Sequence, residues 1–321
     1  DSTSTLAGNT PATPGVGTWS VFSGTAVIAE ANNPNSAVSG LGVGLHELVW
    51  TIYNGMCGFG PPSTDTLRIR VYDASAPNAL TGESISACTP VSSVTLGGNA
   101  AVFPAIGTWT IGSGAGTFVD PNDPTTVVND LVVGQHDFVW TIDNGACGTS
   151  SSGQTVLIYD DQAPTADAGP DQELCLPDPS TDLSANAVVF PASGVWTITA
   201  GQGTFADLND PLSNVTGLAV GTNTFVWNIN NGPCGTTTDE VTIVVFDDQQ
   251  PIANAGADQS FCTPVTSTTL EGSAVTFPAT GTWVFLEGSA NLSDPNNPTA
   301  ALDGLSPGVY VLQWLVDNGP C

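Results

Sequence analysis

The residues of this chain whose types and spacing could do chemistry are its cysteines, two histidines and many carboxylates. Regularly spaced cysteines are typical of disulfides in an oxidising compartment or of a zinc site. Zinc is disfavoured here, because the chain has no Cys-x-x-Cys motif and both histidines lie elsewhere in the sequence. We therefore expect disulfides. The seven cysteines stand at positions 57, 88, 147, 175, 234, 262 and 321.

The two histidines do not look like catalytic residues. His46 and His136 each follow a Val-Gly pair by one residue, and Asn223 and Tyr310 stand near the equivalent positions further along. A catalytic base is not normally a turn residue that other copies of a repeat replace. The chain has no Gly-x-Ser-x-Gly nucleophile motif, and without lysine it cannot form a P-loop. We expect no enzymatic activity.

The carboxylates raise a different possibility, which is calcium binding. Ca²⁺ takes six to eight oxygen ligands, and aspartates in turns can supply them. The alternative is that Asp, Asn and Pro simply build turns here. A second set of loop aspartates stands at positions 120, 123, 207, 210 and 294. The candidate calcium ligands between copies of the repeat are Asp160, Asp161, Asp167 and Asp171, and then Asp247, Asp248 and Asp258.

A tandem repeat organises all these residues. Cys88, Cys175 and Cys262 are spaced by 87 residues, and each is followed 21 residues later by a tryptophan. A second tryptophan follows after 31 residues, and another cysteine 7 residues after that. Trp19, Trp50 and Cys57 keep the last two distances. The sequence thus predicts four copies, at 1–75, 76–163, 164–250 and 251–321, the first and last incomplete.

Each copy has the pattern of a β-sandwich. Apolar residues alternate along short segments, as at Phe138, Trp140 and Ile142, and turn residues separate the segments. Asn144-Gly145 and Asn231-Gly232 indicate tight hairpins before the last strand of a copy. We predict an all-β array of immunoglobulin-like, antiparallel, seven-stranded sandwiches. The predicted core residues are Trp19, Trp50, Trp109, Trp140, Trp196, Trp227, Trp283 and Trp314.

Two disulfide schemes fit the repeat. Pairs between adjacent copies would be Cys57–Cys88, Cys147–Cys175 and Cys234–Cys262. In a sandwich we expect the start of the first strand and the last hairpin at the same end, and the cross-copy partner ~40 Å away along the last strand. A disulfide joins Cα atoms only ~4.4–6.8 Å apart. We therefore predict pairs within a copy, with Cys57 paired outside this sequence: Cys88–Cys147, Cys175–Cys234 and Cys262–Cys321.

Composition excludes several partners. The 321 residues include 30 Asp and Glu but only 2 Lys and Arg, so the formal net charge is −28. Such a chain lacks the basic face that nucleic acids or an anionic membrane surface would attract. Its longest apolar runs are far below the ~18 residues of a membrane span. An apolar content of 40% and eight tryptophans also argue against disorder.

Recurring motifs resemble a known repeat class. They include Ala-Gly-Pro-Asp-Gln (168–172), Gly-x-Gly-Thr-Phe (114–118 and 201–205) and Phe-Val-Trp-x-Ile-x-Asn-Gly-x-Cys-Gly (225–235). The copies resemble the PKD-like and Ig-like repeats of very large surface proteins of Bacteroidota. The best known of these are gliding-motility adhesins exported by the type IX secretion system. The resemblance implies an extracellular location on the outer surface of the cell.

The expected function is therefore structural. We expect a stalk or filament segment of a surface adhesin, which holds a distal adhesive tip away from the cell and carries tension. Its partners would be other domains of the same long chain, with surface polysaccharide or other cell-surface proteins as further candidates. Two alternatives remain open: an array of carbohydrate-binding modules, and a filament that assembles when neighbouring chains add a strand to a sheet.

Overall fold

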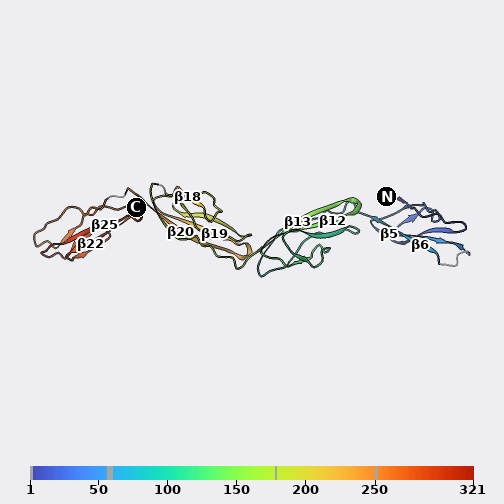
Figure 1. The fold of residues 1–321 in the computed structure, drawn as a ribbon, viewed down its shortest axis with the longest axis horizontal. Helices are drawn as coiled ribbons and strands as arrows, with labels where there is room; N and C mark the ends of the chain where they lie inside the picture. The colour runs from blue at the N-terminus through green and yellow to red at the C-terminus, as the bar shows by residue number, and fades with distance from the viewer. Residues whose placement is uncertain (1–2, 56–60, 178, 250–251) are drawn as a thin grey trace. The chain divides into compact units, whose positions relative to one another are not determined.

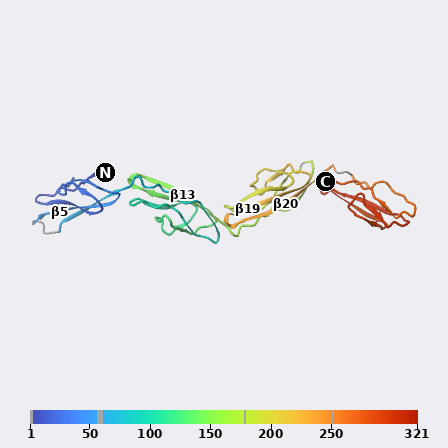
Figure 2. The ribbon, with the colours of Figure 1, turned by 180° about the vertical axis from the view of Figure 1, so that it is seen from behind.

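A computed structural model describes residues 3–55, 61–177, 179–249 and 252–321 of the chain. The chain forms two compact units, Asp1–Tyr159 and Asp160–Cys321. Within them the ribbon is built from short β-strands (Figure 1), as the reverse view in Figure 2 also shows. Apart from two single-turn 3₁₀ helices, η2 (Gly145–Cys147) and η3 (Gly232–Cys234), the regular elements of the described residues are all strands. The predicted all-β class is confirmed.

The second copy shows the complete strand set. Its larger sheet has the order β7-β13-β12-β9 and its smaller sheet the order β10-β11-β8. These seven strands form the two faces of an immunoglobulin-like sandwich. Their bounds are β7 (Ile85–Cys88), β8 (Val94–Thr95), β9 (Ile106–Ser113), β10 (Thr117–Phe118), β11 (Val127–Asn129), β12 (Gly134–Asp143) and β13 (Thr149–Tyr159).

The third copy repeats this topology in the second unit. Its sheets have the orders β14-β20-β19-β16 and β15-β18-β17. Its strands are β14 (Gln172–Cys175), β15 (Thr181–Asp182), β16 (Ser193–Ala200), β17 (Thr204–Phe205), β18 (Asn214–Thr216), β19 (Gly221–Asn230) and β20 (Thr236–Phe246).

The first and fourth copies contain parts of the same pattern. The first copy has sheets β2-β5-β6 and β1-β4-β3, and the fourth has β22-β25 and β21-β24-β23. The strands of the first copy are β1 (Ser4–Thr5), β2 (Val16–Ser23), β3 (Val27–Ile28), β4 (Ala37–Ser39), β5 (Gly44–Tyr53) and β6 (Ser63–Val71). Those of the fourth are β21 (Ser267–Thr269), β22 (Thr280–Glu287), β23 (Asn291–Leu292), β24 (Ala301–Asp303) and β25 (Val311–Asp317).

One pairing differs from the fully antiparallel sandwich that the sequence predicts. The first strand of a copy runs parallel to the last, so that β7 pairs with β13 and β14 with β20. In the third copy, Cys175 at the end of β14 lies opposite Phe246 at the end of β20. The leading cysteine therefore ends the first strand rather than preceding it, and it lies at the end of the domain from which the chain leaves.

Each copy has its own apolar core, centred on a pair of tryptophans. Residues of the four clusters come from 6–71, 79–158, 166–245 and 270–316, and no cluster mixes two copies. All eight tryptophans are buried. The two of a copy stand directly opposite each other on paired strands, as Trp109 and Trp140 do, and their ring centroids are 5.0–5.2 Å apart. The four predicted ranges stay predictions, although each contains one core.

A glycine two residues before the first tryptophan makes room for the second. A Cβ atom placed on Gly107 would lie 2.2 Å from Cζ2 of Trp140, and on Gly194 it would lie 2.3 Å from Cζ2 of Trp227. Real Cβ atoms essentially never approach another heavy atom so closely. The Gly-x-Trp motif is thus a packing motif, in which one ring lies across the bare backbone of the neighbouring strand.

Candidate functional site

Two of the cysteines meet where one copy joins the next. In the second unit, Cys175 and Cys321 form a disulfide with their Cα atoms 5.5 Å apart. Cys175 belongs to the third copy and Cys321 to the fourth, at a sequence separation of 146 residues. The predicted pairs Cys175–Cys234 and Cys262–Cys321 are therefore wrong, and so is the adjacent-copy pair Cys147–Cys175.

Strand direction explains this correction. We expected the leading cysteine and the hairpin cysteine of one copy at the same end of the sandwich. Cys234 instead precedes β20, whereas Cys175 lies beside Phe246 at the far end of that 11-residue strand. At 3.3 Å per residue these two cysteines are separated by roughly 35 Å. The cysteine that comes within reach of Cys175 is the hairpin cysteine of the following copy.

The remaining cysteines also disagree with the predicted pairs within one copy. Cys147 and Cys262 are free and exposed, which contradicts the predicted Cys88–Cys147 pair as well. Cys88 and Cys234 are each disulfide-bonded. Cys57 lies outside the described residues.

The hairpin asparagine contacts the preceding copy beside the disulfide. Asn318 donates a hydrogen bond from Nδ2 to the backbone carbonyl of Asp247, at 2.9 Å. A Cβ on the next residue, Gly319, would lie 2.5 Å from the ring of Phe246, so that ring rests on bare backbone. Gly319 has φ +54°, which glycine adopts without strain. The Asn-Gly pair thus forms the hairpin turn and also packs against Phe246, the last residue of β20.

The same contact recurs at the corresponding positions of the repeat. Asn144 donates to the carbonyl of Asp73 at 2.8 Å, and Asn231 donates to the carbonyl of Asp160 at 2.7 Å. In the first unit, Gly145 likewise lies against the ring of Tyr72. Each asparagine is 71 residues from its acceptor. The residues that join the copies are therefore part of the repeat itself.

The predicted calcium sites are not assembled. Among the described residues, no group of three or more His, Cys, Asp or Glu side chains is placed to hold a metal ion. Several of the named aspartates instead cap turns: Asp160, Asp167 and Asp247 each accept a hydrogen bond from the backbone N–H two residues later, at 2.9–3.0 Å. Asp171 accepts from the N–H of Thr242 at 2.8 Å. The turn-building explanation therefore holds for Asp160, Asp167 and Asp247.

The loop aspartates behave in the same way. Asp120 and Asp123 accept from the N–H groups of Asn122 and Thr125, and Asp207 and Asp294 make the equivalent turn contacts. Each of these carboxylates accepts a hydrogen bond from a backbone N–H of its own loop. These described loops therefore do not form a shared metal site. Asp161, Asp248 and Asp258 belong to the predicted junction set, which the structure does not gather into a site.

The histidines occupy buried structural positions. Nδ1 of His136 accepts a hydrogen bond from the N–H of Ala115 at 3.0 Å, and Nε2 lies 2.8 Å from the carbonyl of Val132, to which it donates. His46 makes the same two contacts in the first copy. Asn223 takes over in the third copy: its Oδ1 accepts from the N–H of Gln202 and its Nδ2 donates to the carbonyl of Ala219.

The replacement of His by Asn at this position of the repeat leads to a testable prediction. We expect His136→Leu to destabilise the second copy by about 2 kcal/mol, because it removes the hydrogen bonds of the buried His136 ring to the N–H of Ala115 and the carbonyl of Val132. His136→Asn keeps both hydrogen bonds and should cost less than half as much. Hydrogen exchange of β12 in the full chain measures the difference. Equal losses for the two variants would show that the hydrogen bonds do not stabilise this position.

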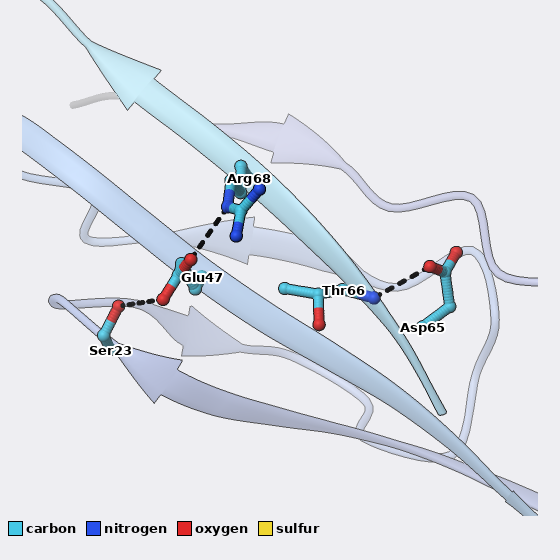
Figure 3. Close-up of polar contacts among 5 residues, drawn as sticks. All are labelled: Ser23, Glu47, Asp65, Thr66 and Arg68. Atoms are coloured by element: carbon cyan, nitrogen blue, oxygen red, sulfur yellow. Dashed lines mark hydrogen bonds and ion pairs between the residues drawn. The ribbon is translucent and has the colours of Figure 1, made fainter. Parts of the chain in front are cut away.

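The sheet of the first copy carries the ion pair between Arg68 and Glu47 (Figure 3). Nε of Arg68 lies 2.8 Å from Oε1 of Glu47, and Ser23 donates to Oε2 of the same carboxylate at 3.1 Å. The hydrogen bond from Arg68, followed by that from Ser23, lowers the pKa of Glu47. In the second copy, hydrogen bonds from Ser113 and Thr155 lower the pKa of Asp137. These contacts join side chains of neighbouring strands within one sheet.

Comparison with known proteins finds relatives that match part of the chain. No family model matches the chain. The dyslexia-associated protein KIAA0319-like protein of Mus musculus is 28% identical over 207 residues, which is 60% of this chain and 20% of that protein. The mouse KIAA0319 homolog is 27% identical over 203 residues. The chain thus spans about a fifth of the length of these relatives.

Solved structures that resemble the chain contain similar kinds of domain. The PKD domain of KIAA 1837 protein is 30% identical and covers 28% of this chain and 93% of its own, with a TM-score of 0.24. Immunoglobulin domains 1–5 of Sidekick-1 are 11% identical and cover 97% of this chain and 76% of theirs, with a TM-score of 0.34. Within the described residues, no helix could cross a membrane. Strand order, repeat and separate cores together make this chain a tandem array of immunoglobulin-like β-sandwich domains.

Proposed function

We propose that the chain is a structural segment of an extracellular adhesin stalk or filament, which holds a distal adhesive tip away from the cell and carries tension. The observation that carries this proposal is the Cys175–Cys321 disulfide, which joins two successive copies rather than closing one. A bond inside a copy would stabilise that copy alone. A bond between copies transmits force even where the polypeptide between its ends is slack.

Two further features support a stalk. Disulfides form and persist in oxidising surroundings outside the cytosol, in line with an extracellular location. The net charge of −28 makes neighbouring stalks repel each other and so resists lateral clumping. The motif resemblance extends the proposal to the outer surface of a Bacteroidota cell, with type IX secretion and a role in gliding or attachment. The proposed partners are other domains of the same long chain and surface molecules at the tip.

The carbohydrate-binding alternative has less support. Sugar-binding modules stack sugar rings on exposed aromatic faces, and all eight tryptophans of this chain are buried in the domain cores. We expect no glycan on an array to bind the oxidised chain more tightly than it binds a heat-unfolded sample. A saturable, fold-dependent glycan interaction would favour the alternative over the stalk.

The stalk proposal is tested by holding the oxidised full chain at constant force in magnetic tweezers. The expected result is that unfolding of the third and fourth copies adds little length, because the Cys175–Cys321 bond bypasses the residues between its ends. Steps in which both of these copies release their full length at the same force would contradict a tension-carrying role. A chain in which the disulfides have been reduced serves as the comparison, since its copies can extend fully.

A further inference from the structure

Each hairpin asparagine that contacts the preceding copy is followed by a glycine, and such a pair can react with itself. The backbone nitrogen of the glycine attacks Cγ of the asparagine, since glycine has no side chain to hinder the approach. Ammonia leaves, and a five-membered succinimide ring forms. Water then opens the ring to aspartate or isoaspartate, so the net reaction consumes one water and releases one ammonia. The pairs are Asn144-Gly145, Asn231-Gly232 and Asn318-Gly319.

The folded hairpin holds Asn144 in a geometry that does not react. Its ψ of 30° turns the nitrogen of Gly145 away from Cβ of Asn144, whereas ring closure needs both on the same side. The N–H of Gly145 donates to Oδ1 of Asp143 at 2.9 Å. Nδ2 of Asn144, the leaving group, donates to the carbonyl of Asp73 at 2.8 Å. The attacking nitrogen and the leaving nitrogen are therefore both engaged in hydrogen bonds.

Part of this restraint on Asn144 comes from the first copy. The ring of Tyr72 lies against Gly145, since a Cβ built on this glycine would be 2.2 Å from Cζ of the tyrosine. Rotation of the peptide between Asn144 and Gly145 toward ring closure must displace the glycine from this close contact and break the hydrogen bond to Asp73. The reaction therefore requires that these contacts between the first and second copies, here called the first junction, open beforehand.

The product of the reaction would not fit the closed first junction. Oδ1 of Asn144 is buried and has no hydrogen-bond donor among the described residues. Conversion of Nδ2 to a carboxylate oxygen removes the donor to Asp73 and places a second acceptor opposite that carbonyl. The new negative charge would be buried without a partner and close to the carboxylate of Asp143, which is strongly unfavourable. Asn318 has the same buried Oδ1 without a donor in the described part of the chain.

We propose that Asn144 is a modification site at which water converts the amide to a carboxylate once the first junction opens, and that the product keeps the junction open. Closed, the junction protects the amide. Open, it exposes the amide to succinimide formation, and the resulting charge prevents the contact from forming again. Opening thus leaves a permanent covalent record. The repeat places Asn318 in the same position, and the inference does not depend on the proposed stalk function.

The rate of deamidation tests the protection. The full chain in mildly alkaline buffer is compared with the same chain unfolded in urea, and peptide mass spectrometry separates Asn144 from its two products. The folded chain should react at least about tenfold more slowly, because only molecules with an open junction react. Equal rates in the folded and the unfolded chain would overturn the proposal.

Two tyrosine variants separate the first junction from the hairpin itself. Tyr72→Ser removes the ring that lies on Gly145 and should raise the rate at Asn144 about tenfold, with no change at Asn231. Tyr53→Ser removes an exposed ring at the end of β5 in the same copy and should change neither rate. An unchanged rate at Asn144 in Tyr72→Ser would show that the hairpin alone protects the amide, which contradicts control by the junction.

A protease experiment tests whether the product keeps the first junction open. Chymotrypsin cleaves after aromatic residues, so cleavage after Tyr72 reports an open junction. Asn144→Asp should be cleaved there at least about fivefold faster than Asn144→Ala, because alanine removes the hydrogen bond without adding a charge. Hydrogen exchange of β12 checks that the second copy stays folded in both variants. Equal cleavage of the two variants would refute the effect of the charge on closure.

Discussion

Reducing the disulfides is expected to lengthen the force-unfolded chain by about 500 Å. The Cys175–Cys321 bond spans 146 residues, and an extended chain covers at most ~3.3–3.6 Å per residue. In the oxidised chain, tension that reaches Cys175 can cross directly to Cys321, so the residues between them carry no load. Reduction removes this path and exposes the third and fourth copies to the applied force. Single-molecule pulling with and without reductant measures the change in contour length.

A variant without leading cysteines provides the matched control. The double substitution Cys88→Ser and Cys175→Ser removes both disulfide-bonded leading cysteines, so this chain should reach the long contour length without reductant. In the unsubstituted chain, peptide mapping under non-reducing conditions should recover Cys175 linked to Cys321. Recovery of Cys175 linked to Cys234 would instead support pairing within one copy, and the same contour length in both redox states would contradict the expected load path.

Gly107→Ala is expected to destabilise the second copy by about 3 kcal/mol or more. The added methyl would lie 2.2 Å from Cζ2 of Trp140, well inside contact distance. Trp140 cannot move away easily, because it is completely buried, packs against Trp109 at 5.2 Å and donates from Nε1 to the carbonyl of Asn99 at 3.1 Å. Overpacking in a close-packed core usually costs about 1–3 kcal/mol, and here a backbone-attached atom meets a fixed ring.

The control for this variant lies in the same sheet. A methyl on Gly153 in β13 would meet its nearest neighbour, the carbonyl oxygen of Phe138, at 3.9 Å. Gly153→Ala should therefore change stability by no more than about 0.5 kcal/mol, as substitutions away from core features usually do. Hydrogen exchange of peptides from β12 and β19 in the full chain separates the second copy from the third. Equal protection loss in β12 for both variants would refute the packing role of Gly107.

Much of the fold follows from local pattern. Alternation placed Phe138, Trp140 and Ile142 on one inward face, and all three are buried in β12. The Thr117–Phe118 segment after the glycine-rich turn forms β10 as a separate strand. Such features can be predicted from the sequence because they depend on neighbouring residues. The side chains of a strand alternate between its two faces, and a turn needs residues that adopt particular backbone angles. The same locality explains why the aspartates build turns rather than a shared metal site.

The contacts between copies are not local, and here the sequence was ambiguous. The 87-residue period produces cysteine pairs at separations of 59, 28 and 146 residues, and each of these separations recurs in the chain. Strand direction alone chooses among them, because it decides which end of a sandwich each cysteine reaches. The hairpin asparagines show the same limit: Asn-Gly predicts the turn, but not the hydrogen bond from Asn318 to Asp247 across the junction.

By itself, the sequence determined that this protein is an acidic array of β-sandwich repeats with paired tryptophans in their cores, because burial and turn formation act over a few residues. The tertiary structure alone decided that the first strand runs parallel to the last and that Cys175 bonds Cys321 of the next copy. A disulfide needs two sulfurs brought together in space, and that proximity depends on the arrangement of whole strands, which residue spacing does not encode.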